Sequence, residues 1–180
     1  MNLGELIALA DPYDEAVDRA LDRVRGGPLD RVAYGLSEAA NHSRLWHVVG
    51  VASAMLPGGG GRRQVVEMSV VLGIESALVN GPVKSLFRRP RPADRDHPHQ
   101  LRRPKTSSFQ SGHATSAFTA AAVLAYHRPA GRPAWYLLAA AVASTRAWVG
   151  IHHASDVVGG AVIGVGLGRL ATAVLRRLPG

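Results

Sequence analysis

The sequence predicts an all-α membrane helical bundle, in which about five apolar helices follow amphipathic N-terminal helices. Apolar stretches of helical length alternate with arginine-rich connections over residues 45–175. These stretches are rich in Gly and Ala, which suits close helix packing in a bilayer. Polar residues occur singly within them, as expected for groups that face the interior of a bundle. A soluble helical bundle is the alternative, because no stretch is a clean run of eighteen apolar residues.

The amino-acid composition limits the kinds of binding partner and site that the protein can have. The 180 residues fit one domain, with a mean hydropathy of +0.04 and a formal charge of +8. Arginine carries most of this charge, which indicates an acidic partner such as phosphate, nucleic acid or an anionic membrane surface. The absence of cysteine excludes disulfides, thiolate zinc sites and a cysteine nucleophile. The first residues lack a basic start and a long apolar core, so no signal peptide is expected.

Residues 1–42 are expected to form amphipathic N-terminal helices. Asp11-Pro12 is typical of a helix start, and apolar residues then recur at helical spacing as far as Gly26-Gly27. A second segment of the same kind covers residues 29 to about 41. Both are too polar to span a bilayer, so they would lie on the membrane surface, pack across the mouth of the bundle, or form an ordinary soluble pair.

Residues 43–180 are expected to form the bundle as a single domain. Its apolar helices are predicted over residues 45–56, 65–83, 114–126, 133–150 and 157–175. Pro57 and a run of four glycines separate the first two. Glu67 and Glu75 lie inside the second, where we expect hydrogen bonds to neighbouring helices.

The first stretch with chemical potential runs from Lys84 to Arg91-Pro92, where an apolar helix ends. A lysine and an arginine seven residues apart can cage an anion there, although a basic cluster flanking a membrane is the alternative. Further basic residues, most of them expected to be exposed and to attract anions, follow in the loop to residue 109: Arg88, Arg89, Arg95, Arg102, Arg103 and Lys105. The His97-Pro98-His99 sequence is expected to be a polar loop rather than a metal site.

The second stretch is Ser111-Gly112-His113, immediately before an apolar helix. Backbone N–H groups and the helix dipole favour an oxyanion at such a terminus. His113 would then be close enough to give a proton to a leaving alkoxide. The alternative is that Ser111 is only an N-cap and His113 a polar residue of the first turn.

The third stretch joins two apolar helices and contains Arg146, His152 and Asp156. If Asp156 opens a helix, its carboxylate can reach the imidazole four residues earlier and set its tautomer. A neutral histidine beside a fixed guanidinium is what nucleophilic attack on phosphorus requires. His153 lacks the four-residue relation to Asp156. The alternative is a loop with a structural arginine and a capping aspartate.

Together the three stretches resemble the signature of the type 2 phosphatidic acid phosphatase superfamily, which also contains the vanadium haloperoxidases. The resemblance covers roughly residues 45–175. Two positions depart from the family pattern: Gln110 stands in place of a proline, and Thr145 stands in place of a serine and keeps the hydroxyl. Neither departure removes a catalytic group.

The resemblance implies a role for each matching residue. His152 would attack phosphorus and form a phosphohistidine, Asp156 would orient His152, and His113 would protonate the leaving group and later activate water. The phosphate oxygens would be bound by Lys84, Arg91, Ser111, Gly112 and Arg146. Three cations around the transferred group would remove the need for a metal or another cofactor, so none is expected.

The expected function is that of a metal-independent lipid phosphatase in the bacterial inner membrane. A polyprenyl-linked substrate is expected first, such as a polyprenyl diphosphate or a polyprenyl-phosphoryl sugar phosphate, with phosphatidylglycerophosphate and phosphatidate as alternatives. A vanadium haloperoxidase and a non-enzymatic basic protein that binds anionic lipid or nucleic acid are the rivals. The expected partners are the lipid phosphate and the bilayer, without nucleic acid, and the positive-inside rule places the active-site side in the cytoplasm. No oligomeric state is predicted.

Overall fold

A computed structural model describes residues 5, 9–58, 60–92 and 106–178, and every regular element among them is helical. Two short α-helices come first, α2 (Asp11–Asp22) and α3 (Leu29–Ala39). Five further helices form the bundle: α4 (Arg44–Met55), α5 (Gly61–Leu78), α6 (Gly112–His127), α7 (Arg132–Trp148) and α8 (Ala154–Leu175). The all-α prediction is therefore confirmed, and each predicted apolar helix lies where it was expected, within a few residues.

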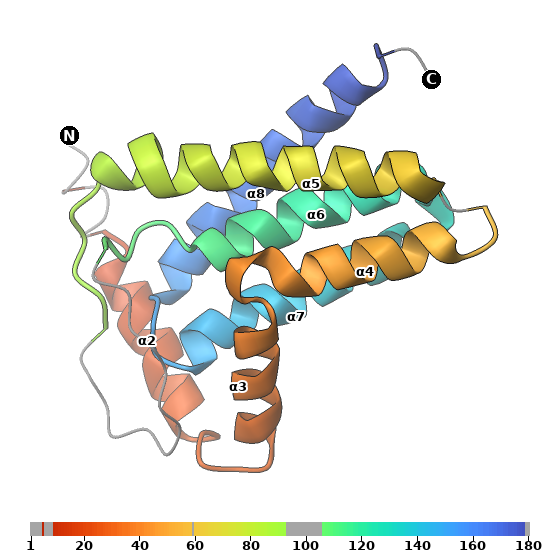
Figure 1. Ribbon diagram of the computed structural model, residues 1–180. Coiled ribbons are helices and arrows are strands. Elements are labelled where there is room, and N and C mark those ends of the chain that lie inside the picture. The colour runs from red at the N-terminus through yellow and green to blue at the C-terminus, as the bar shows by residue number, and fades with distance from the viewer. Residues whose placement is uncertain (1–4, 6–8, 59, 93–105, 179–180) are drawn as a thin grey trace.

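The bundle is built around α6. Helices α4 to α7 run alongside one another in alternating directions, while α8 crosses behind α5 and α6 (Figure 1). Helix α6 contacts α5, α7 and α8 and is buried along most of its length. It can occupy this central place because its buried side chains are mostly alanines and threonines, which let neighbouring backbones approach closely.

The contact between α6 and α8 depends on glycine. A Cβ atom at Gly160 would lie 2.5 Å from the Ser111 carbonyl oxygen, and one at Gly164 would lie 2.5 Å from the Thr115 carbonyl oxygen. No side chain fits in that space, so glycine at these positions lets the two helices touch backbone to backbone. The close approach brings the start of α8 against the start of α6.

Four helix ends consequently meet at one end of the bundle, at the left of Figure 1. There α5 and α7 end, and α6 and α8 begin. A π-helical segment (Val79–Val83), which contains Pro82, follows α5 and leads into Lys84. Gly150, with φ +66°, provides the left-handed residue in the turn between α7 and α8.

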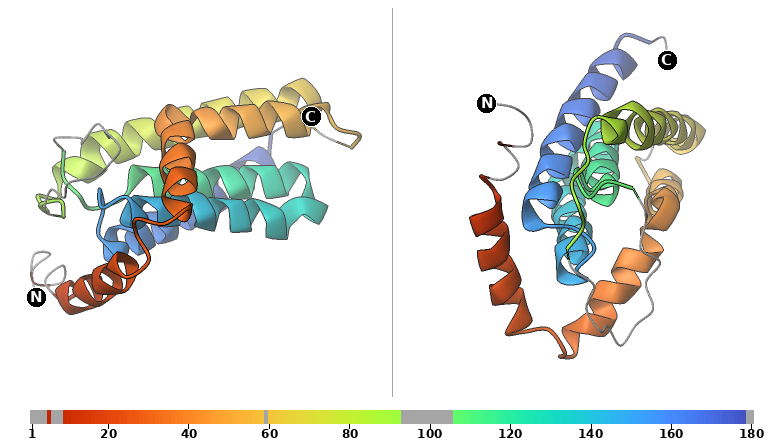
Figure 2. Two further views of the ribbon diagram at one scale, coloured as in Figure 1. Left: turned by 90° about the horizontal axis from the view of Figure 1, so that it is seen from below. Right: turned by 90° about the vertical axis from the view of Figure 1, so that its left-hand side faces the viewer.

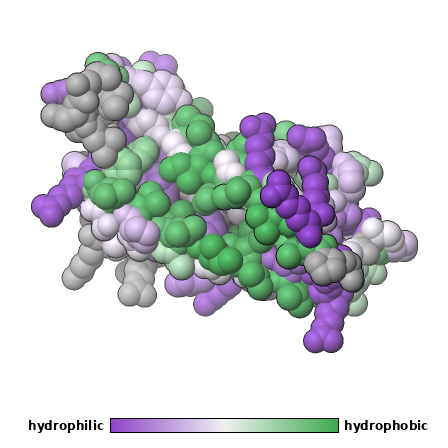
Figure 3. Space-filling view, turned by 90° about the horizontal axis from the view of Figure 1, so that it is seen from above, coloured by the Kyte–Doolittle hydropathy of each residue, from purple (hydrophilic) through white to green (hydrophobic). Residues whose placement is uncertain are grey.

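Two helices are long and apolar enough to cross a membrane, Gly61–Val83 and Ala154–Leu175. Val66, Val70 and Ile74 form an exposed apolar row at helical spacing on α5. Apolar side chains form a broad patch on this face of the molecule (Figure 3). The expected number of five membrane helices is not confirmed, because α4 has only 12 residues and is about 18 Å long.

Helices α2 and α3 pack across the end of the bundle where the four helix ends meet (Figure 2). The Arg25 guanidinium donates hydrogen bonds to the carbonyl oxygens of Ala147 and Trp148, both at 2.7 Å. The Trp148 indole in turn donates to Asp30 at 2.8 Å. Of the three arrangements expected for this region, packing across the bundle mouth is therefore the one found.

Candidate active site

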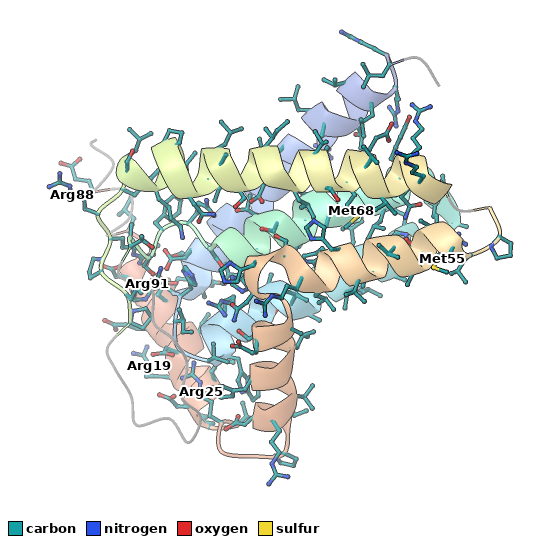
Figure 4. The ribbon with its side chains drawn as sticks, viewed as in Figure 1. Arg19, Arg25, Met55, Met68, Arg88 and Arg91 are labelled. Atoms are coloured by element: carbon teal, nitrogen blue, oxygen red, sulfur yellow. The ribbon has the colours of Figure 1, made fainter. Side chains whose placement is uncertain are left out.

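A cavity of about 450 Å³ lies at this end of the bundle. Six residues of the three predicted stretches line it: Lys84, Arg91, Gly112, His113, Arg146 and His152. We call Lys84, Arg91 and Arg146 the cationic cup. Arg88 projects outward at the edge of the molecule, whereas Arg91 lies inward (Figure 4). Residues separated by up to 68 positions in the sequence thus share one hollow.

The Arg91 guanidinium is held beside His152 by backbone carbonyl groups. It donates to the carbonyl oxygens of Thr106 and Ser107 at 3.1 Å and to that of Ile151 at 3.0 Å. One of its terminal nitrogens, Nη1, lies 3.2 Å from His152 Nε2. The positive charge is therefore fixed next to the imidazole that faces the cavity.

The hydrogen bonds of His152 define its tautomer. Nδ1 lies 2.8 Å from the Ser108 carbonyl oxygen. A carbonyl can only accept, so Nδ1 carries the proton and Nε2 keeps its lone pair. Burial lowers the pKa of His152 to about 4; Asp156 opposes this shift, while the positive charges of Arg91 and Arg146 add to it. The imidazole is therefore neutral at neutral pH, and its role as a nucleophile stays a prediction.

Asp156 lies behind the cavity rather than in it. It is fully buried, and its carboxylate is 3.8 Å from His152 Nδ1, too far for a hydrogen bond. Instead it accepts hydrogen bonds from the Ser108 hydroxyl and from the His153 backbone N–H, at 2.9 Å in the latter case. The expected direct contact is replaced by an indirect one through Ser108, so the orienting role of Asp156 stays a prediction.

Ser111 is also outside the cavity, while Gly112 lines it. The Ser111 hydroxyl accepts from the Ala114 N–H at 3.4 Å, as an N-cap does, and its backbone N–H donates to the Asp156 carbonyl oxygen at 3.1 Å. Ser111 is buried and does not line the cavity, so phosphate binding by this residue stays a prediction. A Cβ at Gly112 would lie 3.9 Å from Lys84 Nζ, so the ammonium group is beside the start of α6.

The cationic cup brings three positive charges close together. Burial and the nearby charges of Arg91 and Arg146 lower the pKa of Lys84 to about 8. Arg146 is buried and donates from Nη1 to the Ser37 hydroxyl, but its Nε has no hydrogen-bond partner among the described residues. Buried cations with unused donors are costly unless an anion joins them. The arrangement therefore suits a phosphate group.

Sequence reasoning missed Asn41. Its side-chain oxygen lies 3.0 Å from His113 Nε2, and both residues line the cavity. Asn41 is the first residue of a short 3₁₀ turn (Asn41–Ser43), and the two residues that follow it in this turn, His42 and Ser43, have left-handed φ values of 54° and 58°. An asparagine after a helix is common and belongs to none of the three stretches, so no sequence signal distinguished it.

Most of the basic residues after Lys84 were expected to be exposed, and Arg89 is an exception. It is buried because Asp14 and Asp156 both pair with its guanidinium. Arg88 is exposed, as expected. The other basic residues of that loop and the His97-Pro98-His99 sequence lie outside the described residues. Glu75 accepts a hydrogen bond from Ser116 on α6, in line with the interior role expected for it.

The chain was compared with known proteins. A sequence model of the PAP2 superfamily matches residues 64–179. The chain is 34% identical to the decaprenylphosphoryl-5-phosphoribose phosphatase of Mycolicibacterium smegmatis over 129 residues, which cover 71% of this chain and 69% of that protein. It is 32% identical to the protein of the same name from Mycobacterium tuberculosis over 146 residues, which cover 79% of this chain and 78% of the relative.

Solved structures show the same fold. The transmembrane PAP2 type phosphatidylglycerolphosphate phosphatase of Bacillus subtilis aligns with a TM-score of 0.72 at 24% identity, over 95% of this chain and 88% of that one. LpxE of Aquifex aeolicus aligns with a TM-score of 0.69 at 24% identity, over 88% and 93%. Because the superfamily match covers more than half of the sequence and includes all three helix-end stretches, the chain belongs to the PAP2 superfamily.

Proposed function

We propose that the protein is a metal-independent membrane lipid phosphatase that acts on polyprenyl-linked phosphates through a phosphohistidine at His152. The observation that carries this proposal is a neutral imidazole whose unprotonated Nε2 lies beside Arg91 in a cationic cup, where Arg146 Nε has no hydrogen-bond partner among the described residues. Such a cup can bind a phosphate dianion and stabilise the charge that develops on its equatorial oxygens.

The reaction would proceed in two displacements. His152 Nε2 attacks phosphorus, the bond from phosphorus to the leaving oxygen breaks, and its electron pair stays on that oxygen. His113 donates a proton to the leaving oxygen. His113 then takes a proton from water, and the resulting hydroxide attacks the phosphorus of the phosphohistidine. The bond from phosphorus to His152 Nε2 breaks, its electron pair returns to Nε2, and phosphate is released.

The shape and polarity of the cavity support a polyprenyl-phosphoryl sugar phosphate more than a diphosphate. A volume of about 450 Å³ lies within the range of roughly 300–1,000 Å³ found for pockets that hold small organic ligands. Away from the cationic cup the cavity is lined by hydroxyl and amide side chains: Asn41, Ser43, Ser76, Asn80 and Ser116. Such groups suit sugar hydroxyls. Two relatives are named as phosphatases of a decaprenylphosphoryl phosphoribose, which is a substrate of this chemical class.

We further propose that the bundle lies in the bacterial inner membrane with the cavity on the cytoplasmic side. The support is the exposed apolar row on α5 and the arginine-rich segments at the cavity end. The chain contains no cysteine, so single cysteines can report the orientation. Arg88→Cys at the cavity end should resist an impermeant maleimide in intact cells, while Ala130→Cys at the opposite end should react. The reverse pattern would place the cavity outside.

A substrate panel tests the proposed activity. Purified protein in detergent would be offered a polyprenyl-phosphoryl pentose phosphate, a polyprenyl diphosphate, phosphatidylglycerophosphate and phosphatidate, each with EDTA and with vanadate. We expect vanadate-sensitive phosphate release that resists EDTA, fastest from the sugar phosphate and absent in His152→Ala. Release that strictly requires added Mg²⁺, or no release from any lipid, would contradict the proposal. Halide oxidation that depends on vanadate would favour a haloperoxidase instead.

A further inference from the structure

A buried ion network lies behind the nucleophile, and one of its members comes from α2. Arg89 has a side chain only 4% exposed, yet it pairs with Asp14 at 2.7 Å and with Asp156 at 2.8 Å. The two carboxylates are themselves 5% and 0% exposed. Removing one partner of such a network leaves the others buried and unpaired, which is strongly unfavourable. Asp14 is therefore part of what holds Arg89 and Asp156 in place.

Asp14 also fixes the first turn of α8 directly. Its Oδ1 accepts from the Ser155 backbone N–H at 2.7 Å, and its Oδ2 accepts from the Ser155 hydroxyl at 2.6 Å. Ser155 immediately precedes Asp156 and follows the turn that carries His152. A carboxylate at the N-terminus of a helix is also favoured by the helix dipole. These hydrogen bonds attach helix α2 to the segment that carries His152.

The network reaches His152 through Ser108. The Ser108 hydroxyl donates to Asp156, its backbone N–H donates to the Arg89 carbonyl oxygen at 2.9 Å, and its carbonyl oxygen accepts from His152 Nδ1 at 2.8 Å. The contacts therefore run without interruption from Asp14 through Arg89, Asp156 and Ser108 to the imidazole.

We propose that Asp14 is a positioning residue for His152, so that α2 is a functional part of the active site and not only a surface helix. Residue 14 lies outside the part of the chain that the superfamily model matches, residues 64–179. The inference rests on the proposed phosphatase function. It requires that Asp14 influence the attack by His152 while leaving the cationic cup unchanged, because Asp14 contacts none of Lys84, Arg91 and Arg146 in the described hydrogen bonds and ion pairs.

The test compares Asp14→Asn with wild type. The amide keeps the shape of the side chain but removes the charge that faces Arg89. We expect kcat to fall about tenfold or more, while KM and the inhibition constant of inorganic phosphate stay within about threefold. Asp14→Glu, which restores the charge, should recover part of kcat. Glu15→Gln is the matched control, because Glu15 is on the same helix and 70% exposed in its pair with Arg19, and it should behave as wild type.

Ser155→Ala provides a second variant if Asp14→Asn does not fold. It removes the hydroxyl that donates to Asp14 and accepts from Arg89 and keeps every charge, so we expect a loss of two- to fivefold in kcat with unchanged phosphate inhibition. All assays would run well below the lowest melting temperature of the set. A kcat for Asp14→Asn within twofold of wild type would overturn the inference, as would an equal weakening of phosphate inhibition. A wild type that releases no phosphate from any lipid would instead overturn the proposed function, and this inference with it.

Discussion

The bundle helices and the N-terminal helices contribute to the same cavity in different ways. The segments from α5 to α8 supply the cationic cup together with His113 and His152. The N-terminal segment supplies hydrogen-bond partners for these groups and for the buried arginine behind them: Ser37 to Arg146, Asn41 to His113 and Asp14 to Arg89. Reactive side chains and the residues that hydrogen-bond to them thus come from separate parts of one chain.

The two regions differ because burying a charged or polar side chain is unfavourable unless it is hydrogen-bonded. A cation or an imidazole in a low-dielectric site needs partners for its remaining donors, and these partners must approach from outside the helix that carries it. The bundle helices already use their own faces for close packing. Helices α2 and α3 cover the open end and can therefore provide those partners. Substitutions in the two regions should differ in size accordingly.

The largest expected effect is at the nucleophile. His152→Ala removes the proposed nucleophile, so we expect a loss of about 10⁴-fold or more in kcat. His113→Ala removes only the proposed general acid and should lose about 10² to 10⁴-fold. Phosphate release and trapping of the phosphorylated protein would measure both. Comparable residual activity in the two variants would contradict these roles.

The next effect concerns the contact that brings α6 and α8 together. Gly160→Ala places a Cβ 2.5 Å from the Ser111 carbonyl oxygen, so the helices must separate. Such overpacking typically costs about 1–3 kcal/mol of unfolding free energy, and here it also moves His152 away from the start of α6. Thermal unfolding in detergent and kcat would both be measured. Gly166→Ala on the same helix is the control, because nothing lies within 4 Å of its added Cβ and it should be stable and active.

A smaller effect is expected at the support of the general acid. Asn41→Ala removes the hydrogen bond to His113 Nε2, and the loss of about 1.4 kcal/mol corresponds to about a tenfold decrease in kcat. Arg44→Gln serves as control, since Arg44 is exposed and does not line the cavity. If Asn41→Ala lost as much activity as His113→Ala, the N-terminal segment would carry chemistry of its own, and the distinction between the two regions would fail.

The smallest effect at neutral pH is expected from Lys84→Arg. The pKa of Lys84 is lowered to about 8, so as pH rises through this value the free enzyme loses the ammonium charge and kcat/KM falls. Arginine keeps its charge throughout this range, so the variant should change kcat/KM little at pH 7 and shift the alkaline fall to higher pH. An unchanged alkaline limb in the variant would assign that limb to another group.

Part of this site could be predicted from the sequence because its residues follow local rules. Lys84, Arg91, His113, Arg146 and His152 each lie at the end of an apolar stretch, and the spacing within each stretch marks them. Asn41 and Arg89 could not be found in this way. Asn41 has no spacing relation to any reactive residue, and Arg89 looks like its exposed neighbour Arg88 until the position of Asp14 is known.

The positions of the helices, and which of their ends carry charge, could be predicted from the sequence, because apolar runs, prolines and glycines influence the structure of only a few neighbouring residues. The tertiary structure alone decided that Ser108 lies between Asp156 and His152, that Ser111 caps its helix outside the cavity, and that α2 reaches the buried arginine. These are contacts between segments up to 141 positions apart, as for Asp14 and Ser155. They depend on how closely the glycines of α8 let it approach α6, which is a property of packing and not of any single stretch.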